Sequence, residues 1–557
     1  MNDDPEPQKA NRPSKHKRVR RIRFGLIAVL ATAALGFNLS IAYYLANDEP
    51  DDGRVYSLLA VNLLDHNVFS IEKSEPFTPT FVRVPGYPLF LAGVYSVAGN
   101  GNDTAVRVGQ AILYVFACFF AYLTAWNWRG GTRRRRRKAA VWTFVLAAFC
   151  PFASIYVATL LTETLTIFLM AAMTAAATCG LMTSSKIRAI LCWIAAGVVS
   201  GVCVMVRPDA GLFTMGIGLT LLLSVFFRSR EHTLGSRFCA VFLNGVIFSA
   251  AFCLVLVPWT VRNERVFGVF QPLSPAHGET PGEFVTHGYF LWLRTWIDDS
   301  RYIGPMLWDL GDKRINVDDL PATAFASGEE KTRVAALIDA YNNSDPAHPI
   351  AKPEPMPDAD AGDDQNNTND SGDNGDDKSD DSGDAESADN VKLNLAITPD
   401  TDSEFAVIAG ERIASEPMRF YVMLPAKRSA SMWFDTHSDY YPFAGELFPL
   451  KALDEDNYQH VWLPLFAGFM WFYTLIAVAG VVLLMLGRRP MARLWLIMAM
   501  LMTLPRIAFF GTLENPEPRY LVELFLFAAI LGGIALAGVR CRCPRDAASV
   551  TASYSGN

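Results

Sequence analysis

The chain has 557 residues, of which 51% are hydrophobic and 12% aromatic, so it is too apolar for an ordinary soluble protein and long enough for several membrane spans. Its formal net charge of −7 is set by residues 357–390, which hold 12 Asp and one Glu against one Lys, while the rest of the chain is net positive. The acidic balance therefore belongs to one segment, and it gives no reason to expect a nucleic-acid partner.

The chain begins with a basic tail, residues 1–23, followed by an apolar run over 24–46. This run is about 23 residues long, which exceeds the apolar core of a signal peptide, and no clear small-residue cleavage site follows it. We therefore expect a retained first membrane span with the basic tail in the cytoplasm.

Nine further apolar runs have the length of a membrane span, and each can cross a ~30 Å hydrocarbon core as a helix that satisfies its own backbone. The predicted spans are 24–46, 104–127, 139–157, 160–182, 188–206, 210–227, 237–258, 462–486, 491–511 and 520–540. The stretch 86–98 is apolar but short, which predicts a re-entrant or interfacial helix. The fold class is thus an all-α polytopic membrane protein with about ten transmembrane helices.

Lys and Arg set the orientation of these spans. With the N-terminus in the cytoplasm, every gap that should be cytoplasmic is basic: 129–138, 184–188, 227–237, 487–493 and 540–545. This pattern predicts an integral protein of the plasma (inner) membrane with both termini cytoplasmic. Residues 47–103 and 259–461 are then extracytoplasmic.

The external region between spans seven and eight is interrupted by residues 357–390, whose low hydrophobicity and high charge predict a disordered linker. Its flanks look folded, and 403–434 has apolar residues at helical spacing. The predicted organisation is a cytoplasmic tail (1–23), a seven-span membrane domain (24–258), an external region (259–461), a three-span membrane domain (462–540) and a second cytoplasmic tail (541–557).

Charged and aromatic side chains gather at the predicted external ends of the spans. A single charge at a span end is more often a boundary residue than a functional one. Glu163 and Arg207, however, lie in short connections between long apolar runs, where ionisable groups usually face a cavity or a partner. The other candidates are Asp51, Asp52, Arg83, Tyr87, Asp209, Arg262, Asn263, Glu514, Glu517, Arg519 and Tyr520.

Carboxylates and arginines that converge on one membrane face suit a reaction on a phosphate-bearing lipid, in which Arg holds the phosphate and a carboxylate handles a proton. Other chemistries have no motif in the chain. It contains no P-loop, no G-x-G-x-x-G after a strand, no H-E-x-x-H and no G-x-S-x-G.

Six short motifs occur in an order that resembles the GT-C superfamily of membrane glycosyltransferases, in the branch of protein O-mannosyltransferases and the lipid A aminoarabinose transferase. They are Asp52-x-x-x-Tyr56, RVPGYPLFL with Arg83 and Tyr87, LTETL with Glu163, VRPDA with Arg207, PWTVRN with Arg262, and PEPRY with Arg519 and Tyr520. The motifs extend over most of residues 24–540. The long external region with its Asp-rich insert departs from the family.

The resemblance implies transfer of a sugar from a polyprenyl-phosphate carrier to a glycolipid, glycan or protein acceptor on the external face. It assigns Asp52 as the catalytic carboxylate and Glu163 as the acidic residue of the second external loop. Arg207, Arg262 or Arg519 would stabilise the phosphate, and Tyr56, Arg83, Tyr87 and Tyr520 belong to the donor-binding motifs. A single displacement implies inversion at the anomeric carbon. No cofactor is required, and the paired carboxylates allow a divalent cation without demanding one.

Alternatives remain open at this stage. The main one is a lipid or sugar transporter without transferase activity, although transporters usually place polar groups near the bilayer midplane and often contain internal repeats. A non-catalytic scaffold leaves Glu163 and Arg207 unexplained, and an oligosaccharide ligase with the same kind of donor is a further option. Asp51 beside Asp52 makes the register ambiguous by one residue, and the spacing to Tyr56 favours Asp52. The sugar and the acceptor are not assigned.

Overall fold

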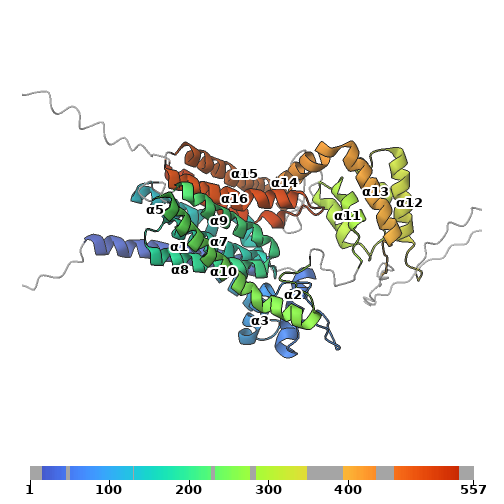
Figure 1. Ribbon diagram of the computed structural model, residues 1–557, viewed down its shortest axis with the longest axis horizontal. Coiled ribbons are helices and arrows are strands. Elements are labelled where there is room, and N and C mark those ends of the chain that lie inside the picture. Colours follow the sequence, from blue (N-terminus) through green and yellow to red (C-terminus); the bar gives the residue numbers. More distant parts are fainter. Residues whose placement is uncertain are drawn as a thin grey trace, which may run out of the picture. The chain divides into compact units, whose positions relative to one another are not determined.

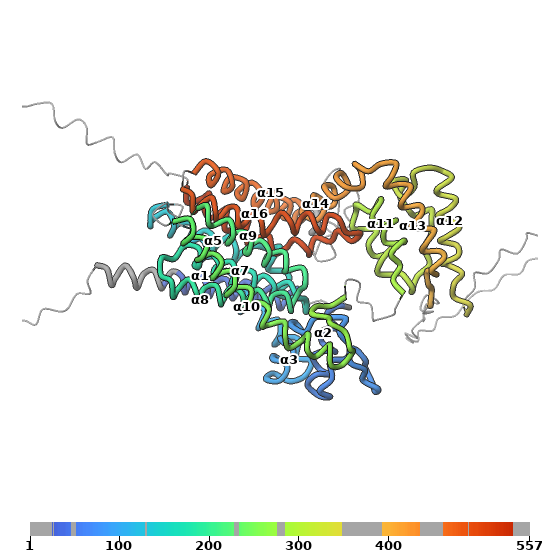
Figure 2. The backbone as a smooth tube through the Cα atoms, viewed as in Figure 1, coloured from blue at the N-terminus to red at the C-terminus, as the bar shows by residue number. Residues whose placement is uncertain are grey.

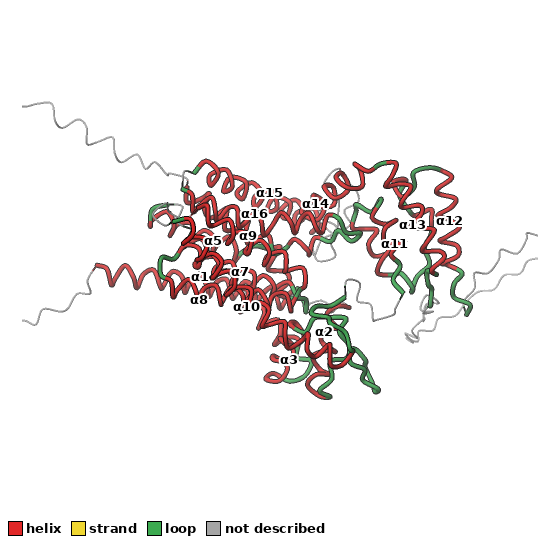
Figure 3. The backbone as a smooth tube through the Cα atoms, viewed as in Figure 1, coloured by secondary structure: helices red, strands yellow, loops and turns green. Residues whose placement is uncertain are grey.

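The structure is a computed structural model that describes residues 15–45, 51–128, 131–227, 233–275, 284–347, 393–434, 457–487 and 489–538. Every regular element in these ranges is a helix, which confirms the predicted all-α class (Figure 3). The Asp-rich segment 357–390 and the predicted tail 541–557 lie outside the described residues, so their predicted properties stay predictions.

The chain divides into two compact units, one formed by Met1–Val285 with Val422–Asn557 and the other by Thr286–Tyr421. The long helices of the first unit are α1 Lys15–Tyr44, α2 Asp51–Asp65, α3 Gly86–Ala98, α4 Asp103–Asn127, α5 Arg133–Ala148, α7 Glu163–Met182, α8 Lys186–Val206, α9 Gly211–Phe227, α10 Leu234–Phe267, α14 Leu424–Phe434, α15 Asn457–Leu486, α16 Pro490–Gly511 and α17 Leu524–Gly538 (Figure 1). Its short helices are α6 Pro151–Ser154, η1 Ile155–Val157, η2 Pro208–Ala210 and η8 Pro518–Leu521. The π-helical turn η7 Arg419–Met423 contains the point in the sequence, between Tyr421 and Val422, at which the chain passes from the second unit to the first.

Eight helices in the described residues are long and apolar enough to cross a membrane, or nine if α5 and the bent segment Pro151–Val157 count as one span. The predicted tenth span corresponds to α17, which is apolar but has only 15 described residues. The predicted count of ten is therefore not confirmed. The seventh predicted span continues as α10 to Phe267, beyond its expected end at residue 258. The short helix expected over 86–98 is α3.

The bundle is built around α7, which is buried along most of its length and packs against α4 and α8. Figure 2 shows the long helices running alongside one another, with α8 next to α10 and α9 next to α16. α17 packs against α5 and α15. α10 and α15 leave large apolar side chains such as Phe242, Leu254 and Leu475 exposed. Such a surface suits lipid tails, which are as apolar as these side chains.

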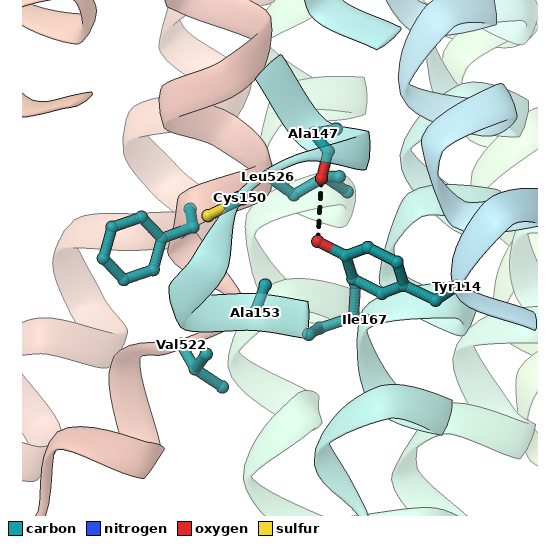
Figure 4. Close-up of a pocket in the computed structure, with 8 residues that line it drawn as sticks. Tyr114, Ala147, Cys150, Ala153, Ile167, Val522 and Leu526 are labelled. Atoms are coloured by element: carbon teal, nitrogen blue, oxygen red, sulfur yellow. Dashed lines mark hydrogen bonds between the residues drawn. The ribbon is translucent and has the colours of Figure 1, made fainter. Parts of the chain in front are cut away.

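A bend of 53° separates α5 from the following helical segment because Pro151 has no N–H to donate to the carbonyl of Ala147. The hydroxyl of Tyr114 donates to that carbonyl at 2.8 Å (Figure 4). The hydroxyl of Tyr473 donates in the same way to the carbonyl of Leu146, at 2.5 Å. The surrounding side chains are apolar, so these contacts stabilise the bend rather than form a site.

The second unit, Thr286–Tyr421, has a hydrophobic core of its own. Its helices are α11 His287–Arg294, η3 Ser300–Tyr302, η4 Gly304–Trp308, η5 Val317–Asp319, η6 Ala322–Ala324, α12 Gly328–Asn342 and α13 Pro399–Ser415. Trp292 and Trp296 are fully buried against Phe405 and neighbouring apolar residues. Arg412 and Glu330 form a buried ion pair at 2.6 Å. The flanks of the Asp-rich segment are therefore folded, and α13 and α14 account for the predicted helical spacing over 403–434.

Close contact between α8 and α10 depends on Gly197. A Cβ at this position would overlap the carbonyl oxygen of Phe248 and lie 2.8 Å from the Cβ of Ala251. Overpacking of this kind costs about 1–3 kcal/mol. We therefore expect Gly197→Ala to lower the midpoint of thermal unfolding of the purified protein in detergent. Gly245→Ala on α10 is the matched control, because nothing lies within 4 Å of its added Cβ. Equal midpoints for the two variants would contradict this packing.

Candidate active site

Asp52 lies in the first turn of α2 and accepts hydrogen bonds from two arginines that come from distant parts of the chain. Its Oδ1 accepts from Nη2 of Arg83 at 3.0 Å, and its Oδ2 from Nη1 of Arg519 at 3.3 Å. Arg83 belongs to the irregular segment between α2 and α3, and Arg519 to η8. Burial alone would raise the pKa of Asp52, but the charges of Arg519 and Arg83 outweigh it and hold that pKa below its ordinary value.

Asp52 stays accessible within this arrangement, since its side chain is 31% exposed and that of Arg83 is 38% exposed. The side chain of Arg519 is only 11% exposed, and its Nε forms an ion pair with Glu517. The two guanidinium groups beside the half-buried Asp52 carry N–H donors that an anion can share with this carboxylate. The side chain of Asp51 lies outside the described part of the structure.

Tyr56 follows Asp52 by one helical turn on α2 and packs edge-to-face on Tyr87, with ring centroids 5.2 Å apart. The hydroxyl of Tyr87 donates to Oε1 of Gln110 at 3.0 Å, and the amide of Gln110 donates to the carbonyl of Thr159 at 2.8 Å. Burial, followed by the charge of Asp52, raises the pKa of Tyr56 to about 12. Tyr56 is therefore a protonated hydroxyl at neutral pH, available as a hydrogen-bond donor beside Asp52.

A second, buried layer of charge centres on Arg207, between α8 and α9. Its Nη1 donates to Glu163 at 3.0 Å and to Glu523 at 3.3 Å, and its Nε donates to Asp209 at 3.0 Å. The side chain of Arg207 is 9% exposed and that of Glu163 is 2% exposed. Oε2 of Glu163 is buried and has no hydrogen-bond partner among the described residues. This arrangement binds Arg207 to three carboxylates rather than leaving it open to a phosphate.

Arg506, near the end of α16, completes the buried layer and was not among the residues expected from the sequence. It forms ion pairs with Asp209 and, at 3.2 Å, with Glu523. Its Nε also donates to the backbone carbonyl of Tyr520 at 3.0 Å. Arg506 and Glu523 both lie inside apolar runs that were predicted to be spans. A charge within such a run was the sequence signal for them.

Tyr520 joins the two layers. The guanidinium groups of Arg207 and Arg519 each lie 5.3 Å from the centroid of its ring, and the ring stacks on Phe510 at 4.6 Å. Next to it, burial raises the pKa of Glu517 above its ordinary value, although Arg519 opposes that shift. The structure therefore brings Asp52, Tyr56, Arg83, Tyr87, Glu163, Arg207, Arg519 and Tyr520 into one cluster.

Arg262 is placed elsewhere. It lies over the rings of Trp259 and Phe267, at 4.8 and 5.0 Å, and Nη1 donates to the carbonyl of Thr80 at 2.8 Å. Its side chain therefore stabilises the segment that carries Arg83 and makes no described contact with the Asp52 cluster. Among the described residues, no group of three or more His, Cys, Asp or Glu side chains could hold a metal ion. The positive charge at Asp52 comes from arginine.

Comparison with known proteins gives one family match. Residues 79–259 match the family model described as dolichyl-phosphate-mannose-protein mannosyltransferase, which confirms the predicted resemblance to protein O-mannosyltransferases. The matched range contains Arg83, Tyr87, Glu163 and Arg207 and excludes Asp52 and Arg519. No curated protein is significantly similar to the chain.

Two solved structures are similar to the chain at low levels. One is ArnT from Cupriavidus metallidurans in the apo state, with 14% identity and a TM-score of 0.34, covering 93% of this chain and 78% of that one. The other is the same protein bound to undecaprenyl phosphate, with 13% identity and a TM-score of 0.35, covering 92% and 78%. Superpositions at this level do not establish a common fold.

The buried layer predicts a compensating pair of substitutions. Arg506→Met leaves Glu523 and Asp209 short of positive charge, and breaking a buried ion pair from one side costs about 3–5 kcal/mol. We expect this variant to lose most of its monodisperse peak in fluorescence-detected gel filtration. Arg506→Met/Glu523→Gln keeps the net charge of the layer and should regain part of the peak. Arg493→Met, at the exposed end of the same helix, is the control and should behave as the wild type. A double variant no better than Arg506→Met alone would contradict the charge balance.

Proposed function

We propose that the chain is a membrane glycosyltransferase that moves a sugar from a polyprenyl-phosphate carrier to an acceptor hydroxyl, with Asp52 as the catalytic carboxylate. The observation that carries the proposal is the half-exposed Asp52 held between Arg83 and Arg519. The family match to mannosyltransferases that use a dolichyl-phosphate donor supports the class of donor. The sugar and the acceptor are not assigned.

The donor phosphate is proposed to bind at Arg83 and Arg519. Guanidinium groups bind phosphate oxygens with paired, charge-assisted hydrogen bonds. A phosphate that takes these donors competes with Asp52 for them and so releases the carboxylate toward the acceptor. Binding of the donor phosphate therefore also frees Asp52 to act as the base.

The transfer itself is a single displacement. The acceptor oxygen forms a bond to the anomeric carbon as the bond from that carbon to the phosphate oxygen breaks. Asp52 accepts the acceptor's proton, and the polyprenyl phosphate leaves with the bonding electron pair on its oxygen, next to the arginines. Attack from the face opposite the leaving group inverts the anomeric centre. Tyr56, which remains protonated, can donate a hydrogen bond to the sugar or to the phosphate.

In this proposal, Glu163 and Arg207 position other residues of the site and take no direct part in the reaction. Arg207 already donates to Glu163, Asp209 and Glu523, and it is buried, so the phosphate role passes to Arg83 and Arg519. Through the ring of Tyr520, Arg207 sets the place of Arg519. A transporter is less well supported than a transferase, because this charge lies at helix ends rather than at mid-span.

Replacing Asp52 tests the catalytic assignment. Asp52→Asn keeps the shape of the side chain but cannot accept a proton, and general-base contributions are about 10²–10⁴-fold in rate. We expect transfer from a radiolabelled polyprenyl-phosphate sugar in membranes to fall at least about a hundredfold. Asp65→Asn, at the exposed end of the same helix, is the matched control and should keep its activity. Wild-type transfer by Asp52→Asn at equal protein level would remove the assignment.

The lowered pKa of Asp52 also predicts the pH dependence of transfer. Because its pKa is lowered, the carboxylate takes up its proton at a lower pH than an ordinary aspartate, so the acid limb of kcat/KM should lie at lower pH than an unperturbed aspartate would give. Arg519→Gln removes the larger of the two charges that lower this pKa and should move the limb to higher pH. Measuring the initial rate against pH for both forms checks this. A limb that Arg519→Gln does not move would contradict the role of the ion pair.

A further inference from the structure

A cavity of about 300 Å³ lies at a place that the reaction above does not use. It is formed where four long helices begin or end: the last residue of α4, the first turn of α5, the last turn of α7 and the first turn of α8. Its lining residues are Asn127, Arg136, Cys179, Met182, Thr183, Ser184, Ser185 and Arg188. None of the eight is acidic.

The length of α7 fixes the depth of this cavity relative to the candidate active site. α7 begins at Glu163, in the buried charge layer, and ends at Met182, in the wall of the cavity. Its 20 residues span about 30 Å at 1.5 Å per residue, the thickness of the hydrocarbon core of a bilayer. The cavity therefore lies one hydrocarbon thickness from the charge layer, at the level of the lipid headgroups on the opposite membrane face.

The polar groups of the cavity suit a phosphate. Nε of Arg136 is buried and has no hydrogen-bond partner within the part of the chain that the structure describes, and Nη1 makes a long contact of 3.4 Å to the carbonyl of Trp126. Arg188, in the first turn of α8, contributes a second guanidinium to the lining. Thr183, Ser184 and Ser185 also line the cavity, and the hydroxyls of Thr183 and Ser185 accept hydrogen bonds from the backbone N–H groups of Ser185 and Arg188. Two arginines with hydroxyls and no carboxylate form a set of donors that an anion with several oxygens can satisfy.

The surface next to the cavity points to a lipid rather than a soluble phosphate. Ile187, Leu191 and Ile194 follow the cavity along α8 at helical spacing and are 73%, 60% and 41% exposed. They form an exposed apolar stripe that begins next to Arg188 in the chain and continues along α8, a helix long and apolar enough to cross a membrane. A headgroup phosphate in the cavity would place its acyl chains on this stripe.

We propose that this cavity binds the phosphate of an anionic phospholipid from the leaflet opposite the candidate active site. In the topology predicted from the basic gaps, this is the cytoplasmic leaflet, whose lipids carry negative charge and attract Lys and Arg at the membrane surface. The proposal does not depend on the proposed transfer reaction. It gives the basic start of α5 a specific ligand in addition to its general role in setting orientation.

Native mass spectrometry of the full-length protein in detergent tests the proposal, with phosphatidylglycerol and phosphatidylcholine of identical acyl chains as probes. An arginine at a membrane surface strengthens the binding of an anionic lipid about fivefold. We expect one phosphatidylglycerol to bind more tightly than phosphatidylcholine. Arg136→Gln/Arg188→Gln should remove that preference, a loss of about 25-fold for two arginines. Arg133→Gln/Arg134→Gln carries the same loss of charge at exposed positions of α5 outside the cavity and should keep the preference.

Two further results would overturn the proposal. Equal losses in the two double variants would mean that general surface charge, not the cavity, attracts the lipid. Inorganic phosphate at millimolar concentration is added in a separate arm. If it displaces phosphatidylglycerol completely, the cavity is a site for free phosphate. Retention of the lipid in its presence, together with loss only in Arg136→Gln/Arg188→Gln, supports the lipid site.

Discussion

The burial of two arginines among three carboxylates is the constraint on which the rest of the membrane unit depends. Arg207 and Arg506 are removed from water, and an isolated buried charge costs several kcal/mol unless it is paired and hydrogen-bonded. Their partners come from the start of α7, from η2 and from the residue before α17. Full pairing is reached only when these helices meet in one arrangement. The ion pairs therefore favour this one arrangement of the helices over others and add little net stability.

This arrangement has a direct consequence for the candidate site. Arg506 holds the backbone of Tyr520, and Arg207 lies against its ring, so the preceding residue, Arg519, is presented to Asp52. Asp52 comes from the segment that follows the first long helix, and Arg519 comes from the segment that precedes the last helix. The site therefore forms only after the N-terminal and C-terminal spans have packed together. The proposed catalytic carboxylate, near the start of the chain, is paired with an arginine near its end.

Hydropathy and charge were sufficient to predict the helical class and the position of most spans, because these follow from the composition of single segments. The motif spacing also indicated Asp52 and Tyr56. The roles of Arg207 and Arg262 could not be predicted, since both are arginines at span ends and only the fold shows which one meets carboxylates and which one meets aromatic rings. Arg506 and Glu523 were missed, although a charged residue within an apolar run was a sequence signal for each of them. The bend after α5 is caused by Pro151, but the predicted span 139–157 treated this stretch as one straight helix.

The most direct measurement of the central claim is an experimental structure of the full-length protein with a polyprenyl phosphate bound. The account predicts that the phosphate lies on the guanidinium groups of Arg83 and Arg519. It also predicts that at least one of their hydrogen bonds to Asp52 is broken, while the pairs of Arg207 with Glu163, Asp209 and Glu523 remain. A phosphate bound at Arg207 or Arg262, with both hydrogen bonds of Asp52 intact, would contradict it.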